Sequence, residues 1–447
     1  MAYMSRAPEN NSAAAGHGYH GPDLISGLPD ELLHHVLTFV PTLDSICTSV
    51  LSRRWIDVWT RVPQLILRDE ILDIELMTDI LSRYAADVYI TDLKICYHWD
   101  YPQLYEAQVT SWAEFAAQRV TGRVDLSVTT QFETAWPNEF VDLPCFGWAT
   151  EISIYSSGMA VRLPPPAAVT GGGDEFTRLT RLQMSHLRLS DDGEGISDVV
   201  SRRCPRLEIL ELDHIGDGVY DDVISLSLHS ESLQSLRIVS VCCLRRLEVD
   251  AANMHEMRVE YCFAESNGPT AMRLSAPAME VLGWEDKCPN EVELITLPMF
   301  LKELFYSEIP DPRSYRVAEI LEHFARVGVL RLSLIHRVQL PYCSELDLSV
   351  ITKQHMSYGS CIIHFLKRNS TIRSLALTLH AYHPEMCRVH KSNSIAAAAG
   401  HSYNGPDLIS SLPNEIFHHV LIILTTPETI RTSVLSHRWI GVWTQLF

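Results

Sequence analysis

The chain has 447 residues, of which 46% are hydrophobic, and it carries a formal net charge of −19 with an isoelectric point near 5.5. This length suffices for two or three domains, or for one small domain and an elongated array, with a sizeable core. The negative charge and the lack of any basic run argue against binding to nucleic acid, whose phosphates select clustered Lys and Arg. Protein partners are therefore the default expectation.

The cysteines and the hydropathy pattern bear on the compartment. Eleven cysteines, an odd number without regular spacing, do not match a secreted disulfide framework. They predict reduced thiols in the cytoplasm or the nucleus. The first residues contain no apolar signal-peptide core, and no run of 18 apolar residues occurs, so we expect neither secretion nor a membrane partner.

One segment of the chain occurs twice. Residues 16–62 and 400–446, aligned without a gap, share 29 of 47 residues. Because everything between the two copies differs, the segment is a portable module. The repeat includes an Ala-rich leader, which is natural if two tandem gene copies were joined or if one gene model was read through into the next.

The first copy has the pattern of about three short helices. Pro29, Asp30 and Glu31 are typical of a helix start, since the first turn needs no N–H from proline and carboxylates favour its positive end. Apolar residues then recur at helical spacing until Pro41, which ends the helix. A core of roughly 40 residues is marginal, so part of this apolar surface should belong to a partner.

The motifs LPDELLHHVL, PTLDSICTSVLSRRW and VWTRVPQL together resemble a plant-type F-box along its whole length. In that family the helices dock on a Skp-type adaptor, which links them to a cullin and a RING protein of a ubiquitin ligase. Asp44 departs from the family, which often has Lys or Arg there. An alternative interpretation is a helical cap that only packs on the next domain. The resemblance implies adaptor contact, or shaping of the contact surface, by Leu28, Pro29, Leu32, Leu33, Val36, Leu37, Val50, Leu51, Ser52, Arg54, Trp55 and Trp59.

The second copy retains most of these positions but differs in the turn after its first helix, where Pro427 is displaced. We therefore expect it to fold less well and to dock only if the rest of the chain leaves it uncovered. Its candidate adaptor-binding residues are Leu412, Pro413, Ile416, Phe417, Val420, Leu421, Val434, Leu435, Arg438, Trp439 and Trp443.

Between the two copies, apolar residues recur at positions i, i+3 and i+5, which is the L-x-x-L-x-L core of a leucine-rich repeat with one short strand per unit. Val124 with Leu126 and Ile152 with Ile154 fill the gap before the regular units. The ten complete triplets are Ile90/Leu93/Ile95, Leu179/Leu182/Met184, Leu207/Leu210/Leu212, Leu233/Leu236/Ile238, Leu244/Leu247/Val249, Met254/Met257/Val259, Met279/Leu282/Trp284, Leu301/Leu304/Tyr306, Val327/Leu330/Leu332 and Ile372/Leu375/Leu377.

The spacing between triplets predicts how the units connect. From Leu182 to Leu210 and on to Leu236 it is 28 and 26 residues, but around Leu247 it falls to 11 and 10. So short a spacing leaves no room for a helix and predicts a return by a tight loop. A helix is predicted near 109–120, with Trp112 on its apolar side. The passages VTSWAEFAAQRVTGRVDLSV and GISDVVSRRCPRLEILEL resemble plant F-box/leucine-rich-repeat proteins.

The predicted fold class is an α/β repeat. A small three-helix F-box precedes a curved leucine-rich-repeat solenoid, whose concave surface binds partners, and a short helical second F-box follows. The predicted boundaries are a disordered leader at 1–22, the F-box at 23–68, the solenoid at 69–380 with its capping helix near 109–120, a linker at 381–404 and the second, truncated F-box at 405–447.

No catalytic, nucleotide-binding or cofactor motif occurs. The acidic segments 191–195 and 213–222 lack the order of a calcium loop and are interpreted as solvated loops. One zinc-like spacing, at His380, His383, Cys387 and His390, is interrupted by Pro384, and a mobile loop is the favoured interpretation. No metal site and no cofactor are therefore predicted, and sparse Lys and Arg argue against the inositol polyphosphate that some plant relatives bind.

The resemblance implies a non-catalytic substrate-recognition subunit of an SCF-type (Skp, cullin, F-box) ubiquitin ligase. Its F-box would hold the Skp-type adaptor, and its repeats would hold an unknown protein for ubiquitylation by the associated cullin and RING machinery. The alternative is a non-degradative interaction scaffold.

Overall fold

The structure of the chain is a computed structural model. It describes residues 25, 27–68, 74–99, 106–130, 140–156, 160–164, 176–189, 193–216, 223–263, 268–307, 323–333, 342–352 and 374–381. The chain divides into two compact units, Met1–Val62 and Pro63–Phe447.

The first unit is helical. It contains α1 (Asp30–Leu37), α2 (Thr42–Cys47), the 3₁₀ turn η1 (Thr48–Val50) and α3 (Arg53–Trp59). Pro29 and Pro41 stand at the N-caps of α1 and α2, and the extended residue Ser52 stands at the N-cap of α3. Proline suits the residue before a helix because no helical hydrogen bond requires its N–H. The buried core of this unit consists of Leu33, Leu37, Trp55, Val58, Trp59 and Val62.

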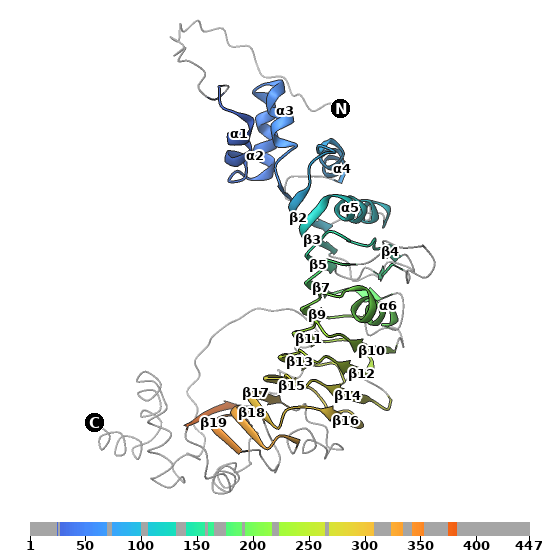
Figure 1. The fold of residues 1–447 in the computed structure, drawn as a ribbon, viewed down its shortest axis with the longest axis vertical. Coiled ribbons are helices and arrows are strands. Elements are labelled where there is room, and N and C mark those ends of the chain that lie inside the picture. Colours follow the sequence, from blue (N-terminus) through green and yellow to red (C-terminus); the bar gives the residue numbers. More distant parts are fainter. Residues whose placement is uncertain are drawn as a thin grey trace, which may run out of the picture. The chain divides into compact units, whose positions relative to one another are not determined.

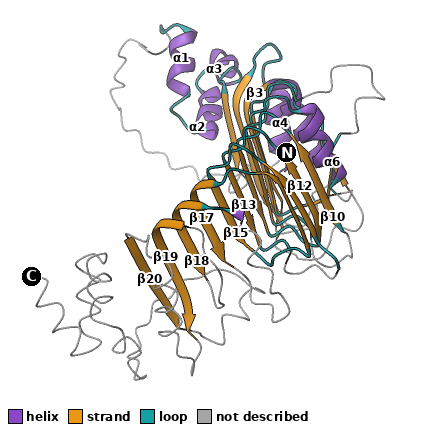
Figure 2. Cartoon of the chain, turned by 60° about the horizontal axis from the view of Figure 1, so that its bottom comes forward, coloured by secondary structure: helices purple, strands orange, loops and turns teal. Residues whose placement is uncertain are grey.

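The second unit is built on one large sheet in which all thirteen strands are parallel (Figures 1 and 2). Its strands follow one another in chain order, so each new strand pairs with the previous one. They are β1 (Gln64–Arg68), β2 (Ile90–Trp99), β3 (Val120–Thr130), β5 (Glu151–Ser156), β7 (Arg181–Ser185), β9 (Ile209–Asp213), β11 (Ser235–Val239), β13 (Glu256–Glu260), β15 (Val281–Glu285), β17 (Phe300–Ser307), β18 (Arg326–Ser333), β19 (Tyr342–Thr352) and β20 (Ser374–Ala381).

From β1 to β17 the chain passes through a second layer between successive strands, to one side of the large sheet (Figure 1). In the first repeats this layer holds the helices α4 (Ile74–Arg83), α5 (Glu106–Arg119) and α6 (Glu194–Asp198), the last continued by the π-helical turn η3 (Val199–Arg203). Two smaller parallel sheets share it: β4 (Phe140–Asp142), β6 (Ala160–Arg162) and β8 (Arg188–Leu189), then β10 (Ile224–His229), β12 (Leu244–Asp250), β14 (Ala271–Ser275) and β16 (Glu291–Thr296).

The core lies between the two layers and is formed by the predicted apolar triplets. Nine of the ten lie in the described residues, and each of their side chains is at most 5% exposed. The parallel register stacks equivalent members, so that Leu210 pairs with Leu182 on one side and with Leu236 on the other. The predicted α/β class is confirmed, and the structure adds that the strands are parallel.

The triplet at Leu244, Leu247 and Val249 forms a strand, as predicted, but this strand is not a unit of the large sheet. These residues lie in β12, which pairs with β10 and β14 in the smaller sheet rather than with the strands of the large sheet. The chain therefore passes from the large sheet to the smaller one and back within 21 residues, from Leu236 to Met257. The connections, residues 240–243 and 251–255, are short, as predicted, but they lead into the smaller sheet and do not close a separate unit. A strand replaces the helix of earlier repeats, and both sheets bury the same alternation of side chains.

The predicted helix near 109–120 coincides with α5, which ends at Arg119, one residue before β3 begins. Its buried residues are Val109, Trp112, Ala113 and Ala116, each at most 2% exposed. Within the described residues, no helix is both long and apolar enough to cross a membrane.

A buried carboxylate organises the turn after β15. Asp286 has no exposed surface and accepts a hydrogen bond from the backbone N–H of Cys262, another from Phe263 at 2.7 Å and a third from Lys287 at 2.6 Å. Backbone donors in a dry interior cost free energy when they lack a partner. One side chain thus satisfies donors in the turns that follow β13 and β15.

We expect Asp286→Ala to lower the free energy of unfolding of the repeat unit by about 3 kcal/mol, because three N–H groups would lose their acceptor. Urea denaturation followed by circular dichroism measures this change. The exposed Asp250 provides the control, since Asp250→Ala should shift stability by no more than about 0.5 kcal/mol. Equal midpoints for the two variants would contradict the assigned role of Asp286.

Candidate functional site: an exposed apolar surface on the helical unit

Helix α1 is apolar on two of its sides. Leu33 and Leu37 are buried, at 2% and 3% exposure, whereas Leu32 and Val36 are each 50% exposed. At about 100° per residue, positions 32 and 36 form one stripe, and positions 33 and 37 form another roughly 100° away. The buried stripe closes the core of the unit, so the exposed stripe is not needed for that core.

Further apolar side chains of this unit are exposed near η1 and α3. Val50 is 88% exposed and Leu51 is 67% exposed, and Ile56 on α3 is 44% exposed. Phe39, just after α1, is 78% exposed and has the His35 ring 5.2 Å away as an edge-on neighbour. Together with the stripe on α1, these side chains form what we call the exposed apolar set: Leu32, Val36, Phe39, Val50, Leu51 and Ile56.

An ion pair joins the start of α1 to α3. The Nε atom of Arg54 donates to Oδ1 of Asp30 at 2.7 Å, and its guanidinium also donates to the backbone carbonyl of Leu28. The pair is partly exposed, so its free energy contribution is about 1 kcal/mol or less. Its geometric effect is larger, because one planar group holds the chain before Pro29 against α3.

The twelve residues that the sequence assigns to the first adaptor surface fall into three groups. Leu33, Leu37, Trp55 and Trp59 are buried, and their side chains form the core of the unit. Leu28 and Arg54 are half-buried. The exposed members are Pro29, Leu32, Val36, Val50, Leu51 and Ser52.

Phe39 and Ile56 are exposed apolar residues that the sequence interpretation omitted. A signal for Phe39 was present, because it continues the stripe of Leu32 and Val36 at a spacing of three residues. For Ile56 the sequence offers only its position beside Trp55, and helical spacing alone does not tell which of two adjacent apolar residues is buried.

The exposed side of the large sheet carries paired charges. Arg123 lies 3.1 Å from Glu151 on the next strand, and Arg181 lies 2.8 Å from Glu211. Lys94 lies 2.5 Å from Asp125, and this hydrogen bond is the main reason why the pKa of Lys94 is raised. Opposite charges on neighbouring strands stabilise each other modestly, and they give this side of the sheet a mixed-charge surface.

Several predicted sites lie outside the described residues. They include the whole second copy of the repeated segment, with its candidates from Leu412 to Trp443, and the zinc-like spacing, in which His383, Cys387 and His390 are not described and the side chain of His380 is not placed. The predictions for these residues stay predictions.

Comparison with known families identifies both units. The F-box domain model matches residues 25–67 and again 409–446. A model of the leucine-rich repeats of FBD-associated F-box protein At5g56370 matches residues 127–300, which run from β3 into β17. The chain therefore contains F-box and leucine-rich-repeat segments, and its relatives are F-box/LRR-repeat proteins. Neither matched model describes a catalytic family.

The F-box and repeat segments are similar to those of curated proteins from Arabidopsis thaliana. F-box/LRR-repeat protein 25 is 29% identical over 242 residues, 53% of this chain and 85% of the relative. F-box/LRR-repeat protein At5g02910 is 31% identical over 238 residues, 53% of this chain and 45% of the relative. F-box protein At5g03100 is 29% identical over 217 residues, 48% of this chain and 64% of the relative. The chain thus spans about half the length of several curated relatives it matches.

Substitution by alanine should have a large effect in the buried stripe of α1 and almost none in the exposed stripe. Leu33→Ala should weaken the hydrogen-exchange protection of α1 and α3 by about 2–5 kcal/mol, because it leaves a cavity in the small core. Leu32→Ala, one residue away, should leave that protection within about 0.5 kcal/mol of the unaltered chain. Exchange measured by mass spectrometry on the full chain resolves the helical unit separately. Equal loss in both variants would contradict the division into buried and exposed stripes.

Proposed function

We propose that this F-box/leucine-rich-repeat protein is a substrate-recognition subunit of an SCF-type ubiquitin ligase. The observation that carries the proposal is the exposed apolar set on a helical unit whose own core is already closed. Six large apolar side chains lie on a unit with fewer than 40 described residues. Exposed apolar surface at such density is typical of a protein-binding site.

The first partner that we propose is a Skp-type adaptor. The F-box match at residues 25–67 includes the whole exposed apolar set. Apolar side chains that are exposed in the free protein gain the most from burial at an interface, about 25 cal/mol for each Å² removed from water. Val50 and Leu51 have larger exposed fractions than Leu32 and Val36 and are the proposed centre of the contact.

Arg54 has a positioning role in this proposal. It fixes the Leu28 carbonyl and Asp30 against α3, and so it sets where the exposed stripe of α1 begins. The buried Trp55 and Trp59 shape the surface from beneath. Of the twelve predicted residues, the exposed ones would touch the adaptor, and the buried ones would act through packing.

The second partner is a protein substrate held by the repeats. We propose that the parallel strands and their returning layer form a curved solenoid, as stacked repeats of this type do. Its strand side offers mixed charges in neighbouring rows, such as Arg181 beside Glu211. Such a surface favours a partner with polar and charged groups of both signs. Ubiquitin transfer itself would be performed by the associated cullin and RING proteins, in the cytosol or the nucleus.

The adaptor proposal is tested by co-purification of the full chain with a Skp-type adaptor. We expect Val50→Ser combined with Leu51→Ser to lower adaptor affinity roughly 30-fold, which corresponds to about 2 kcal/mol of lost apolar contact. Met299→Ser is the matched control, because Met299 is 69% exposed and lies in the repeat unit. It should leave adaptor binding unchanged.

Because a second F-box match is present, the equivalent residues of the second copy are changed as well, in the variant Val434→Ser combined with Leu435→Ser. Loss of binding in the first variant alone supports docking through the first copy. Loss of binding only when both copies are changed would show that either copy can bind the adaptor, and would overturn docking through the first copy alone. Full binding in the combined variant would overturn adaptor docking through these F-box residues.

The same complex separates the ligase from a non-degradative scaffold. An SCF receptor should bring a cullin into the purified complex, and its target should accumulate when the proteasome is inhibited. A complex that holds the adaptor without cullin would contradict the ligase proposal while leaving adaptor docking intact.

A further inference from the structure

Successive strands of the large sheet end in the same unusual turn. The residue after each of four consecutive strands has a positive φ, between 49° and 57°. Residues other than glycine seldom adopt this backbone conformation, although histidine adopts it more often than most. The backbone N–H at each position donates to a carbonyl of the next strand, so the repeat itself imposes the turn. The four residues are His186, His214, Ser240 and Tyr261.

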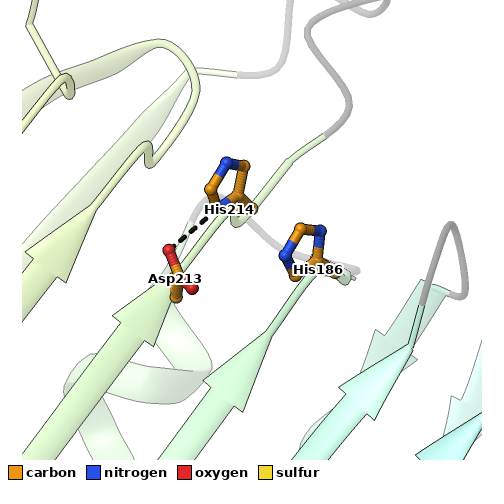
Figure 3. Close-up of side chains that lie close together, drawn as sticks. All are labelled: His186, Asp213 and His214. Atoms are coloured by element: carbon orange, nitrogen blue, oxygen red, sulfur yellow. Dashed lines mark hydrogen bonds and ion pairs between the residues drawn. The ribbon is translucent and has the colours of Figure 1, made fainter. Parts of the chain in front are cut away.

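In two neighbouring repeats this residue is histidine, and the register brings the two side chains together. Ser185 at the end of β7 pairs with Asp213 at the end of β9, so the residues that follow, His186 and His214, are neighbours. Their rings are nearly parallel, at 6°, with centroids 4.4 Å apart (Figure 3). Tyr155 covers His186 from the preceding repeat, with ring centroids 4.9 Å apart.

The carboxylate of Asp213 completes the cluster. Its Oδ1 lies 2.8 Å from Nδ1 of His214 (Figure 3). Its backbone carbonyl accepts a hydrogen bond from the N–H of His186 at 2.8 Å. A His214 ring that donates its Nδ1 proton to Asp213 carries its lone pair on Nε2. Carboxylates orient metal-binding histidines in this way in many proteins.

We propose that His186 and His214 bind one late first-row divalent metal ion, of the class Zn²⁺, Cu²⁺ or Ni²⁺, with Asp213 as the orienting carboxylate. Imidazole nitrogens suit these ions. One nitrogen or oxygen from each of the three side chains lies within 4.8 Å of the others. Two ligands at about 2.0–2.1 Å from a tetrahedral ion lie about 3.3 Å apart, so only a small approach is needed.

The cluster is accessible from solvent. The His214 side chain is 51% exposed, and that of Asp213 is 31% exposed, so an ion can reach the cluster from solvent.

One local adjustment is required. The lone pairs of parallel rings run side by side, so one ring must turn toward the other to share an ion. The exposed His214 can do this, because rotation of an imidazole about its χ2 bond has broad, shallow minima. His186 lies between Tyr155 and His214 and keeps its place. Water or a group from another molecule would fill the remaining coordination positions.

The test uses Cu²⁺ and Ni²⁺ as probes on the purified full chain. Bound ion is counted by equilibrium dialysis under reducing conditions, for the unaltered chain, His214→Asn and His186→Asn. Asparagine tolerates the positive φ at both positions, so the turns should persist, and circular dichroism checks the fold. We expect each variant to lose one bound equivalent or to bind that equivalent at least about tenfold more weakly. Asp213→Asn should weaken binding about 10- to 100-fold without removing the site.

Two controls separate this cluster from the other histidines. His229→Asn changes a histidine at the end of β10 and should keep every bound equivalent. His383→Asn with His390→Asn removes the zinc-like spacing and should likewise keep this site. Electron paramagnetic resonance of bound Cu²⁺ provides an independent measurement, since it should show two imidazole nitrogens that fall to one in His186→Asn. Unchanged stoichiometry and affinity in both His186→Asn and His214→Asn would overturn the proposal.

Discussion

The repeat unit depends on one constraint, the burial of three apolar side chains at positions i, i+3 and i+5 of each repeat, in register with its neighbours. The parallel sheet leaves each inner strand with a partner on both sides, so its N–H and C=O groups are satisfied only when the next repeat is in place. Leu210 between Leu182 and Leu236 illustrates the arrangement. The stability of the unit therefore comes from contacts between neighbouring repeats. Side chains on the exposed side of the strands and in the turns are not needed for the core.

Much of this unit could be predicted because the triplet is a strong and local signal. The triplets located β2, β7, β9, β11, β12, β13, β15, β17 and β18. They missed β19, where Cys343 takes the first place of the triplet and Leu346 the second. The failure at Leu247 has a physical cause. The large and small sheets face each other across one core, so β12 buries the same alternation as β11 and β13. Spacing reveals that a strand exists but does not say which of the two sheets it joins.

The helical unit shows a different limit. The sequence showed that the first helix starts near Pro29 and ends before Pro41, and it marked the apolar residues. It could not separate the residues that hold the unit together from those left exposed, because α1 is apolar on two sides. Leu32 and Leu33 are adjacent and chemically identical, yet one is 50% exposed and the other 2%. Only the packing of α1 and α3 around Trp55 and Trp59 decides between them.

The turns after the strands show how a repeat can acquire a site without altering its fold. The backbone there is fixed by hydrogen bonds to the next repeat, and Ser240 and Tyr261 satisfy it as well as the two histidines do. The repeat therefore determines the backbone conformation at this position but not which side chain stands there. A signal for the histidine pair existed in the sequence, since MSHL at 184–187 and LDHI at 212–215 are separated by the 28 residues of one repeat. It becomes meaningful only once β7 and β9 are known to be neighbours in register. Position within the repeat, more than proximity along the chain, thus determines which residues meet.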